Sequence, residues 1–279
     1  MFSPKWILLG LGCAGSGLGV GLAWPETTEL DFLSVGQGDC AVFRHEGTTI
    51  LVDCGPKNPK VDAGSKYILP KLRAMGANGV DLILLSHPDM DHIGGTGSLI
   101  KAFPEATVAM SSSFRSNKQL LQLLTDWGKS PNQIRWLGAE LEGRVGDFNI
   151  HIDCPQTDPD EETNDGSMLV RISSGAASVV FTGDAPSKIE SAFSHVSNWT
   201  ANVLKAGHHG SRTSTSEGWI EAVHPQYVVL SCGLHNEYHH PHKEVLERLE
   251  DHHISICRTD LEGDIRFRIE NGKFQRVAP

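Results

Sequence analysis

Four potential metal ligands lie within six residues of this sequence, in the segment Ser86–Gly95: His87, Asp89, Asp91 and His92. They directly follow an apolar run, Val80–Leu85, that is typical of a buried strand. Alternate residues of an extended loop can reach one cation, while the adjacent Asp91 and His92 can reach a second one. Because polar sites gather at the carboxyl ends of strands in α/β proteins, we predict a metal centre here rather than a helix-capping polar loop.

A carboxylate follows a second apolar run, in Val-Val-Phe-Thr-Gly-Asp184. It stands just before Pro186, so two roles are open. Asp184 either bridges two cations or forms the N-cap of the helix that begins after it.

Two adjacent histidines flanked by glycine follow a third apolar run, in Gly207–Gly210. Spacing alone does not decide which of them binds metal. We favour His208 as the ligand, with His209 behind it or in contact with substrate. Ser211, directly after them, is a candidate donor to a phosphate group.

A histidine-rich segment, His235–His242, precedes a predicted helix. Most of its histidines are expected at the surface. His240, just before Pro241, is our candidate for a general acid or a substrate contact.

Two further aspartates and one polar turn are candidates for supporting roles. Asp39 and Asp53 each end a predicted strand beside glycine, and a tight hairpin between them would place the two carboxylates on opposite faces of the sheet. One would then brace the site while the other is structural. Asn164 and Ser167 either point to the same edge or belong to a plain turn that closes a polar surface loop at 155–166.

The remaining sequence supplies the elements that must position these residues. Strands are predicted at 29–35, 39–45, 48–53, 80–86, 107–110, 148–153, 168–173, 178–182, 203–206, 227–231, 254–257 and 264–269, and helices at 65–75, 95–103, 117–127, 186–195, 216–222 and 241–251. Many strands are apolar on both faces, which requires helices on both sides of the sheets. We therefore predict an α/β fold, an αββα four-layer sandwich, as one domain over residues 28–279.

The first 23 residues are expected to lie outside this domain. Residues 6–23 form an uncharged, apolar, glycine-rich run. This run is either a signal peptide cleaved after Ala23 or an N-terminal membrane anchor, with a cytoplasmic tail as the third reading. We predict export to the periplasm or the outside of the cell, or attachment to the membrane through this segment.

The composition excludes some classes of protein. With 39% hydrophobic and 21% charged residues the chain is not disordered, and a net charge of −10 excludes a nucleic-acid binder with a broad basic face. Cys40 and Cys54 are the nearest cysteine pair after the leader, and the same hairpin register places them on opposite faces, which disfavours a disulfide. No protein partner follows from the sequence.

Together these motifs resemble the metallo-β-lactamase superfamily, and within it the hydrolase-like domain of the ComEC competence (DNA-uptake) proteins. The resemblance extends over roughly residues 28–270 and rests on the motif around His87–His92, the Thr-Gly-Asp184, the Gly-His-His-Gly-Ser, the leading Phe-Leu-Ser-Val-Gly-Gln-Gly-Asp39, the Asn164-x-x-Ser167 and His240-Pro241. It implies an αββα fold with two divalent metal ions. His87 and Asp89 would hold one ion, Asp91, His92 and His208 the other, and Asp184 would bridge them.

The resemblance also implies an activity and a choice of metal. Most superfamily members have histidine where this chain has Asp89, and an oxygen ligand shifts preference from zinc toward manganese or magnesium. We expect metal-assisted hydrolysis of a phosphodiester, plausibly in single-stranded DNA, since ComEC-type domains are associated with degrading a DNA strand. Asp91 or Asp184 would orient the attacking water, and His240 or His209 would protonate the leaving group.

Two other functions stay open at this point. One is hydrolysis of a small ester, lactone or phosphocholine-type phosphodiester by the same site; the other is a non-catalytic binding module. A single strand would need aromatic residues on which to stack, and four tryptophans are candidates for that role or for the core: Trp127, Trp136, Trp199 and Trp219.

Overall fold

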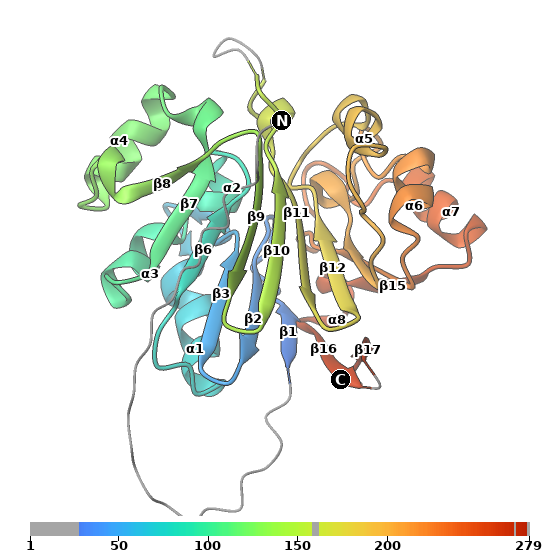
Figure 1. Ribbon diagram of the computed structural model, residues 1–279, viewed down its shortest axis with the longest axis horizontal. Coiled ribbons are helices and arrows are strands. Elements are labelled where there is room, and N and C mark those ends of the chain that lie inside the picture. Colours follow the sequence, from blue (N-terminus) through green and yellow to red (C-terminus); the bar gives the residue numbers. More distant parts are fainter. Residues whose placement is uncertain (1–27, 158–161, 271, 278–279) are drawn as a thin grey trace, which may run out of the picture.

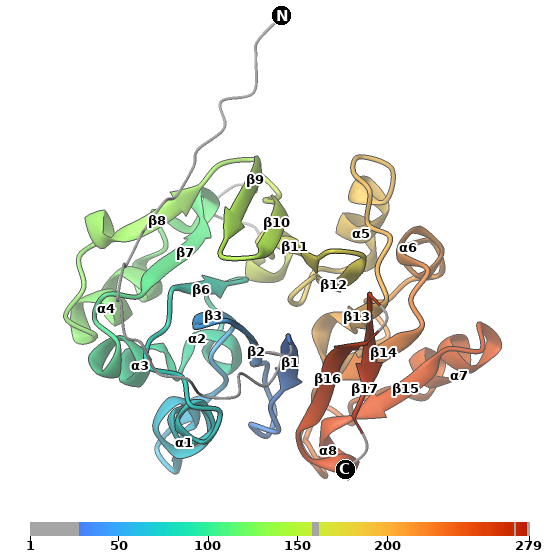
Figure 2. The ribbon, with the colours of Figure 1, turned by 60° about the horizontal axis from the view of Figure 1, so that its bottom comes forward.

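Two β-sheets packed face to face form the centre of the molecule, and helices cover the outer side of each (Figures 1 and 2). The structure is a computed structural model and describes residues 28–157, 162–270 and 272–277. Our predictions for the first 23 residues fall outside the described residues. Within the described ranges, no helix is long and apolar enough to cross a membrane.

The first sheet has eight strands, in the order β17-β16-β1-β2-β3-β6-β7-β8. Its strands are β1 (Glu29–Phe32), β2 (Ala41–His45), β3 (Thr48–Val52), β6 (Leu82–Leu85), β7 (Thr107–Ser111), β8 (Ile134–Leu137), β16 (Ile265–Glu270) and β17 (Lys273–Arg276). An antiparallel meander joins β1, β2 and β3, and β6, β7 and β8 then add parallel to β3. The parallel strands place their carboxyl ends at one edge of the sheet.

The second sheet has seven strands, in the order β15-β14-β13-β12-β11-β10-β9. They are β9 (Glu140–Val145), β10 (Phe148–Asp153), β11 (Leu169–Ser174), β12 (Ala177–Phe181), β13 (Val203–Lys205), β14 (Tyr227–Leu230) and β15 (Ser255–Arg258). β12 to β15 run parallel, so their carboxyl ends also share one edge. A small separate hairpin consists of β4 (Lys57–Asn58) and β5 (Val61–Asp62).

The helices divide between the two outer faces, as Figure 2 shows. The first sheet carries a π-helical turn (Gly64–Ile68) that continues into α1 (Leu69–Ala74), then α2 (Met90–Ile93), α3 (Thr96–Ala102) and α4 (Lys118–Asp126). The second sheet carries α5 (Ser187–Phe193), α6 (Glu217–Val223) and α7 (Lys243–Asp251), and α8 (Thr259–Glu262) follows β15. Each helical layer packs on its own sheet through a separate apolar cluster.

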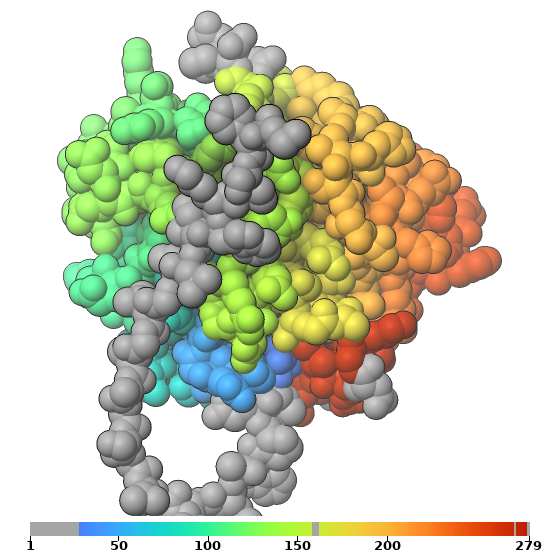
Figure 3. All heavy atoms as spheres, viewed as in Figure 1, coloured from blue at the N-terminus to red at the C-terminus, as the bar shows by residue number. Residues whose placement is uncertain are grey.

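A third apolar cluster, between the sheets, joins the two halves of the fold. Phe32 and Phe43 of the first sheet each lie 5.8 Å, centroid to centroid, from Phe181 of the second sheet. Phe43 also meets Phe148 edge to face at 5.8 Å. Figure 3 shows the N-terminal half, in blue and green, and the C-terminal half, in yellow to red, meeting in one continuous surface.

The predicted αββα fold is confirmed, and the elements that the sequence prediction missed are short or lie at sheet edges. It missed the strands β4, β5, β8, β9 and β17 and the short helices α2 and α8. Of these, β9 (ELEGRV) is a charged outer strand that buries none of its side chains fully. Cys40 and Cys54 are free, as expected, but both lie in the helix-side cluster of the first sheet. Their predicted placement on opposite faces is wrong because Asp53, with φ of 59°, interrupts the alternation of the strand.

Truncating Phe43 tests whether the inter-sheet aromatic cluster stabilises the fold. Phe43 is fully buried, so we expect Phe43→Ala to lower the free energy of unfolding by about 3–5 kcal/mol. Val196→Ala, at a side chain 63% exposed, should change it by less than about 0.5 kcal/mol. Urea denaturation followed by tryptophan fluorescence measures both. Equal stability of the two variants would contradict the packing described above.

Candidate metal centre

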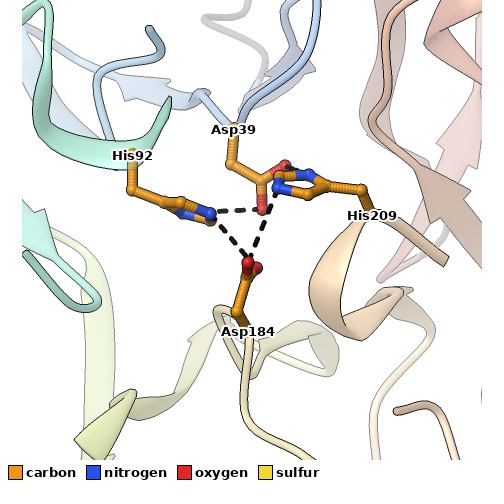
Figure 4. Close-up of side chains that lie close together, drawn as sticks. All are labelled: Asp39, His92, Asp184 and His209. Carbon is orange, nitrogen blue, oxygen red and sulfur yellow. Dashed lines mark hydrogen bonds and ion pairs between the residues drawn. The ribbon is translucent and has the colours of Figure 1, made fainter. Parts of the chain in front are cut away.

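Four side chains from four separate segments converge between the carboxyl ends of the two sheets (Figure 4). Asp39 precedes β2, His92 lies in α2 behind β6, Asp184 follows β12, and His209 follows β13. One ligand atom of each lies within 4.8 Å of the others. The carboxyl ends of the parallel strands β6, β12 and β13 deliver His92, Asp184 and His209 to this edge. Asp39 reaches it from the start of the antiparallel strand β2.

The loop after β6 packs too closely on its neighbours to accept side chains at its two glycines. A Cβ at Gly94 would lie 2.2 Å from the backbone nitrogen of Lys57, and one at Gly95 would lie 2.2 Å from the carbonyl of Cys54. This close approach holds α2 against the end of β3, so that Asp91 and His92 face the cluster.

His92 is fixed by a carboxylate on each side. Its Nδ1 lies 2.8 Å from Asp53 Oδ2, and since a carboxylate only accepts, Nδ1 carries the proton. Nε2 therefore faces Asp184, with 3.1 Å between it and Oδ1. Burial opposes the charged imidazolium, but the carboxylates of Asp184 and Asp53 outweigh it and raise the pKa of His92 well above its ordinary value.

His209 is fixed in the same way. Its Nδ1 donates to the carbonyl of Ser231 (2.9 Å) and lies 3.2 Å from Asp39 Oδ1. Its Nε2 points into the cluster, 3.1 Å from Asp91 Oδ2 and 3.6 Å from Asp184 Oδ2. Burial disfavours the imidazolium, yet Asp184 and Asp39 raise the pKa of His209 to about 10. Each of these two imidazoles thus directs Nε2 at Asp184.

A buried lysine that the sequence analysis did not single out completes this support. Lys205 is only 2% exposed, and its Nζ lies 2.6 Å from Asp39 Oδ2 and donates to the carbonyl of Ala206. Burial opposes ionisation of Asp39, but Lys205 and His209 hold the pKa of its carboxyl well below the usual range. A lysine at the last position of an apolar strand was the signal that could have identified it.

His208 lies on the open side of the centre. Its Nε2 is 3.6 Å from Asp184 Oδ2, its side chain is 30% exposed, and burial and the neighbouring histidines lower its pKa. His209 is 2% exposed and belongs to the four-residue cluster. The geometry therefore favours His209 as the ligand, against our preference for His208 from the sequence.

Asp184 also faces a second group of ligand atoms. His87 Nε2 lies 3.9 Å from Asp184 Oδ2 and 3.6 Å from Asp89 Oδ2. Asp184 therefore stands between the pair His87 and Asp89 and the group that contains His92 and His209. This is the place that a bridging carboxylate requires.

The donor set fits divalent cations. Among the described residues, His87 Nε2 and Asn164 Oδ1 are buried without a hydrogen-bond partner, an arrangement that is costly unless a cation or water satisfies them. Lys205 is the lysine that pairs directly with this group, against five carboxylates at or behind it: Asp39, Asp53, Asp89, Asp91 and Asp184. Imidazole and carboxylate ligands together suit zinc, manganese and iron.

The polar turn before β11 closes one side of the centre. Thr163 Oγ1 donates to Asp89 Oδ1 (2.8 Å), and Ser167 Oγ accepts from the backbone nitrogen of Asp184 (3.3 Å). The prediction that residues 155–166 form a surface loop is wrong at its end, because Asp165 and Gly166 are buried beside the site. Asn164 and Ser167 lie at the edge that we expected.

Asp39 and Asp53 both reach the site, so the prediction that they lie on opposite faces is wrong. The hairpin register is as expected, with Ala41 paired to Val52. The left-handed backbone of Asp53 turns its side chain to the same side as that of Asp39. Each carboxylate then orients one histidine, Asp53 on His92 and Asp39 on His209.

His240 lies at the rim and Ser211 lies within its own loop. The ring of His240 is 5.6 Å from that of His208 and 6.1 Å from that of His209, and its side chain is nearly buried. Burial, His209 and His208 lower the pKa of His240 to about 4, so its imidazole is neutral at pH 7. This state fits a substrate contact better than a general acid. Ser211 Oγ bonds to Thr213 Oγ1 (3.0 Å).

The four tryptophans among the described residues pack with the helices of the two outer layers. Trp199 and Trp219 are fully buried under the helices of the second sheet, where their rings lie 5.3 Å apart. Trp127 and Trp136 pack against the apolar cluster of the first sheet. Trp199 and Trp219 are therefore core residues on which a substrate cannot stack, whereas Trp127 and Trp136 are partly buried at the outer helical layer of the first sheet.

Known proteins with similar sequences show the family of this chain. ComE operon protein 3 of Bacillus subtilis is 31% identical over 270 residues, which are 90% of this chain and 34% of that protein. Competence protein ComA of Neisseria gonorrhoeae is 31% identical over 246 residues, 87% of this chain and 33% of that protein. The chain spans about a third of the length of these relatives.

More distant relatives and solved structures share part of the sequence or the fold alone. Ribonuclease J of Mycobacterium tuberculosis is 28% identical over 148 residues, 51% of this chain and 25% of that protein. The metallo-beta-lactamase fold protein YhfI from Bacillus subtilis, 15% identical, has the same fold with a TM-score of 0.56 over 90% of this chain and 100% of its own. Residues 33–234 match the Metallo-beta-lactamase superfamily, so this chain belongs to that superfamily and is similar to the ComEC-like competence proteins.

Proposed function

We propose that this protein is a metal-dependent phosphodiesterase that cleaves single-stranded DNA. The observation that carries the proposal is the position of Asp184, which faces His87 on one side and His92 and His209 on the other. Such a carboxylate suits a two-cation centre, and two cations suit the transfer of a phosphoryl group because they neutralise its charge. The similarity to competence proteins and to a protein named as a ribonuclease supports a nucleic-acid substrate.

The ligand roles that we propose follow the geometry. Asp91, His92, Asp184 and His209 would hold one cation, and His87, Asp89 and Asp184 would hold the other. Bound there, divalent cations would supply Lewis-acid activation of water and of the scissile phosphoryl group. The oxygen ligand Asp89 favours manganese or magnesium at its position, relative to a site built from histidines alone.

The chain's own residues would orient the reactants. The side chain of Asp91 is 34% exposed, on the open side of the metal centre. It can therefore accept a proton from an attacking water. His240, neutral and at the rim, can donate a hydrogen bond to a substrate oxygen. We propose further that the protein works outside the cytoplasm, on the basis of its apolar residues 6–23.

One set of assays tests the substrate class. We expect the manganese-loaded protein to cleave labelled single-stranded DNA and a chromogenic phosphodiester, to cleave duplex DNA more slowly, and to lose all activity with a chelator until manganese is restored. Asp184→Asn should abolish cleavage because the bridging charge is lost. Turnover of a lactone or a small carboxylic ester without cleavage of DNA would refute the nuclease proposal, and so would the absence of all turnover.

A comparison of the paired histidines tests the ligand assignment. His209→Ala should weaken manganese binding by more than about 100-fold. This is more than the loss expected when a residue that only hydrogen-bonds to a metal ligand is replaced. His208→Ala should weaken it by less than about tenfold, because His208 lies on the open side. Calorimetric titration of both variants measures the difference. The reverse order would restore the assignment to His208.

Removing the charge of Lys205 tests its role behind Asp39. Lys205→Met should weaken manganese binding by about 10–100-fold, because Asp39 loses its cation and His209 its fixed orientation. Lys60→Met, at an exposed position, is the matched control and should bind as the unaltered protein does. Circular dichroism verifies that both variants are folded. Unchanged affinity in folded Lys205→Met would show that the contact is only structural.

A further inference from the structure

An exposed tyrosine, Tyr238, stands at the rim of the centre. Among the described residues, the large apolar side chains that are strongly exposed are Val196, Leu234, Tyr238 and Leu261. Two of them, Leu234 and Tyr238, belong to the loop between β14 and α7 (residues 231–242), which also carries His240. We call this segment the rim loop.

The ring of Tyr238 is linked to the metal centre through His240. It stacks on the imidazole of His240 with 5.6 Å between centroids and 23° between planes. His240 in turn lies 5.6 Å from His208 and 6.1 Å from His209. Tyr238 is 62% exposed, so with one face on His240 the ring offers its other side to solvent.

Hydrogen bonds hold the rim loop in place. The side chain of Asn236 donates to the carbonyls of Gly233 (2.9 Å) and His240 (2.6 Å), and its Oδ1 accepts from the backbone nitrogen of His240 (2.9 Å). The backbone nitrogen of Gly233 donates to Gln37 Oε1 (3.1 Å). Tyr238 is therefore presented by a braced loop, which lowers the entropy that binding would cost.

Arg212 contacts the rim loop through its backbone. The backbone nitrogen of Arg212 donates to His242 Nδ1 (3.0 Å), and the ring of His242 lies 4.9 Å from that of His240. The guanidinium of Arg212 is 61% exposed and lies 3.9 Å from Glu244, a loose surface pair that costs little to exchange. The rim thus combines an aromatic face with a cation that can meet a phosphate.

We infer that Tyr238 is the surface on which a base of single-stranded nucleic acid stacks, next to the phosphodiester that enters the metal centre. The inference rests on the proposed function and names how its substrate is held. Every base offers a π-face, and a single strand has bases free to stack outward, whereas the bases of a duplex are already stacked and paired. Stacking also suits a protein of net charge −10, which cannot follow a long phosphate backbone.

The test uses the metal-loaded protein and a phosphorothioate oligonucleotide that carries 2-aminopurine, whose fluorescence is quenched when it stacks on an aromatic ring. We expect quenching on binding, and a dissociation constant raised by about five- to hundredfold in Tyr238→Ala. Tyr238→Phe should bind as the unaltered protein does, and Val196→Ala, equally exposed but on the segment after α5, is the matched control. A duplex should compete poorly.

Kinetics separate this inference from the proposed function. In Tyr238→Ala, KM for a single-stranded oligonucleotide should rise while kcat/KM for bis(p-nitrophenyl) phosphate stays unchanged. Tyr238-dependent quenching in a protein that cleaves no DNA would support the stacking surface and refute the nuclease. Unchanged binding in Tyr238→Ala, equal competition by a duplex, or equal loss on both substrates would overturn the inference, since the ring would then not hold a base.

Discussion

Asp184 has to stay ionised inside the protein, and the geometry of the centre depends on how that charge is balanced. Burial alone would neutralise it, but His92, His209 and His87 keep the pKa of its carboxyl well below the ordinary value. His92 and His209 have a fixed direction because a hydrogen bond holds the Nδ1 of each ring. Within the described residues, His87 Nε2 is buried without a hydrogen-bond partner, a state that a bound divalent cation would relieve.

Both sheets contribute to this balance, which makes their packing part of the site. Asp39 and Asp53 come from the meander of the first sheet, while Asp184 and His209 come from parallel strand ends of the second. The pair Asp39 and His209 therefore joins the first sheet to the second, while the pair Asp53 and His92 orients a ligand from within the first sheet. A small shift between the sheets would alter the distances around Asp184, so the inter-sheet aromatic cluster has a role in the site as well as in stability.

The negative charge of the molecule and its proposed substrate are compatible once the rim is considered. The centre concentrates carboxylates where cations would bind, and the surface beside it offers Tyr238 and Arg212. Such a surface suits short contacts with a single strand, in which stacking replaces much of the charge attraction. The comparison with the relatives applies to about a third of their length, which is the part that this chain matches.

The sequence by itself determined the layers of the fold and the strand ends that carry the site, because doubly apolar strands and ligand spacing are local patterns. It placed His87, His92 and Asp184 at the carboxyl ends of predicted strands, where a common site can form. It did not decide between His208 and His209, or the faces of Asp39 and Asp53, since a left-handed residue changes the direction of a side chain without changing the pattern of residues. The roles of Lys205 and Tyr238 follow only from the tertiary structure. Lys205 is a charge buried against a carboxylate far away in the chain, and Tyr238 is a ring left exposed by the packing of its neighbours.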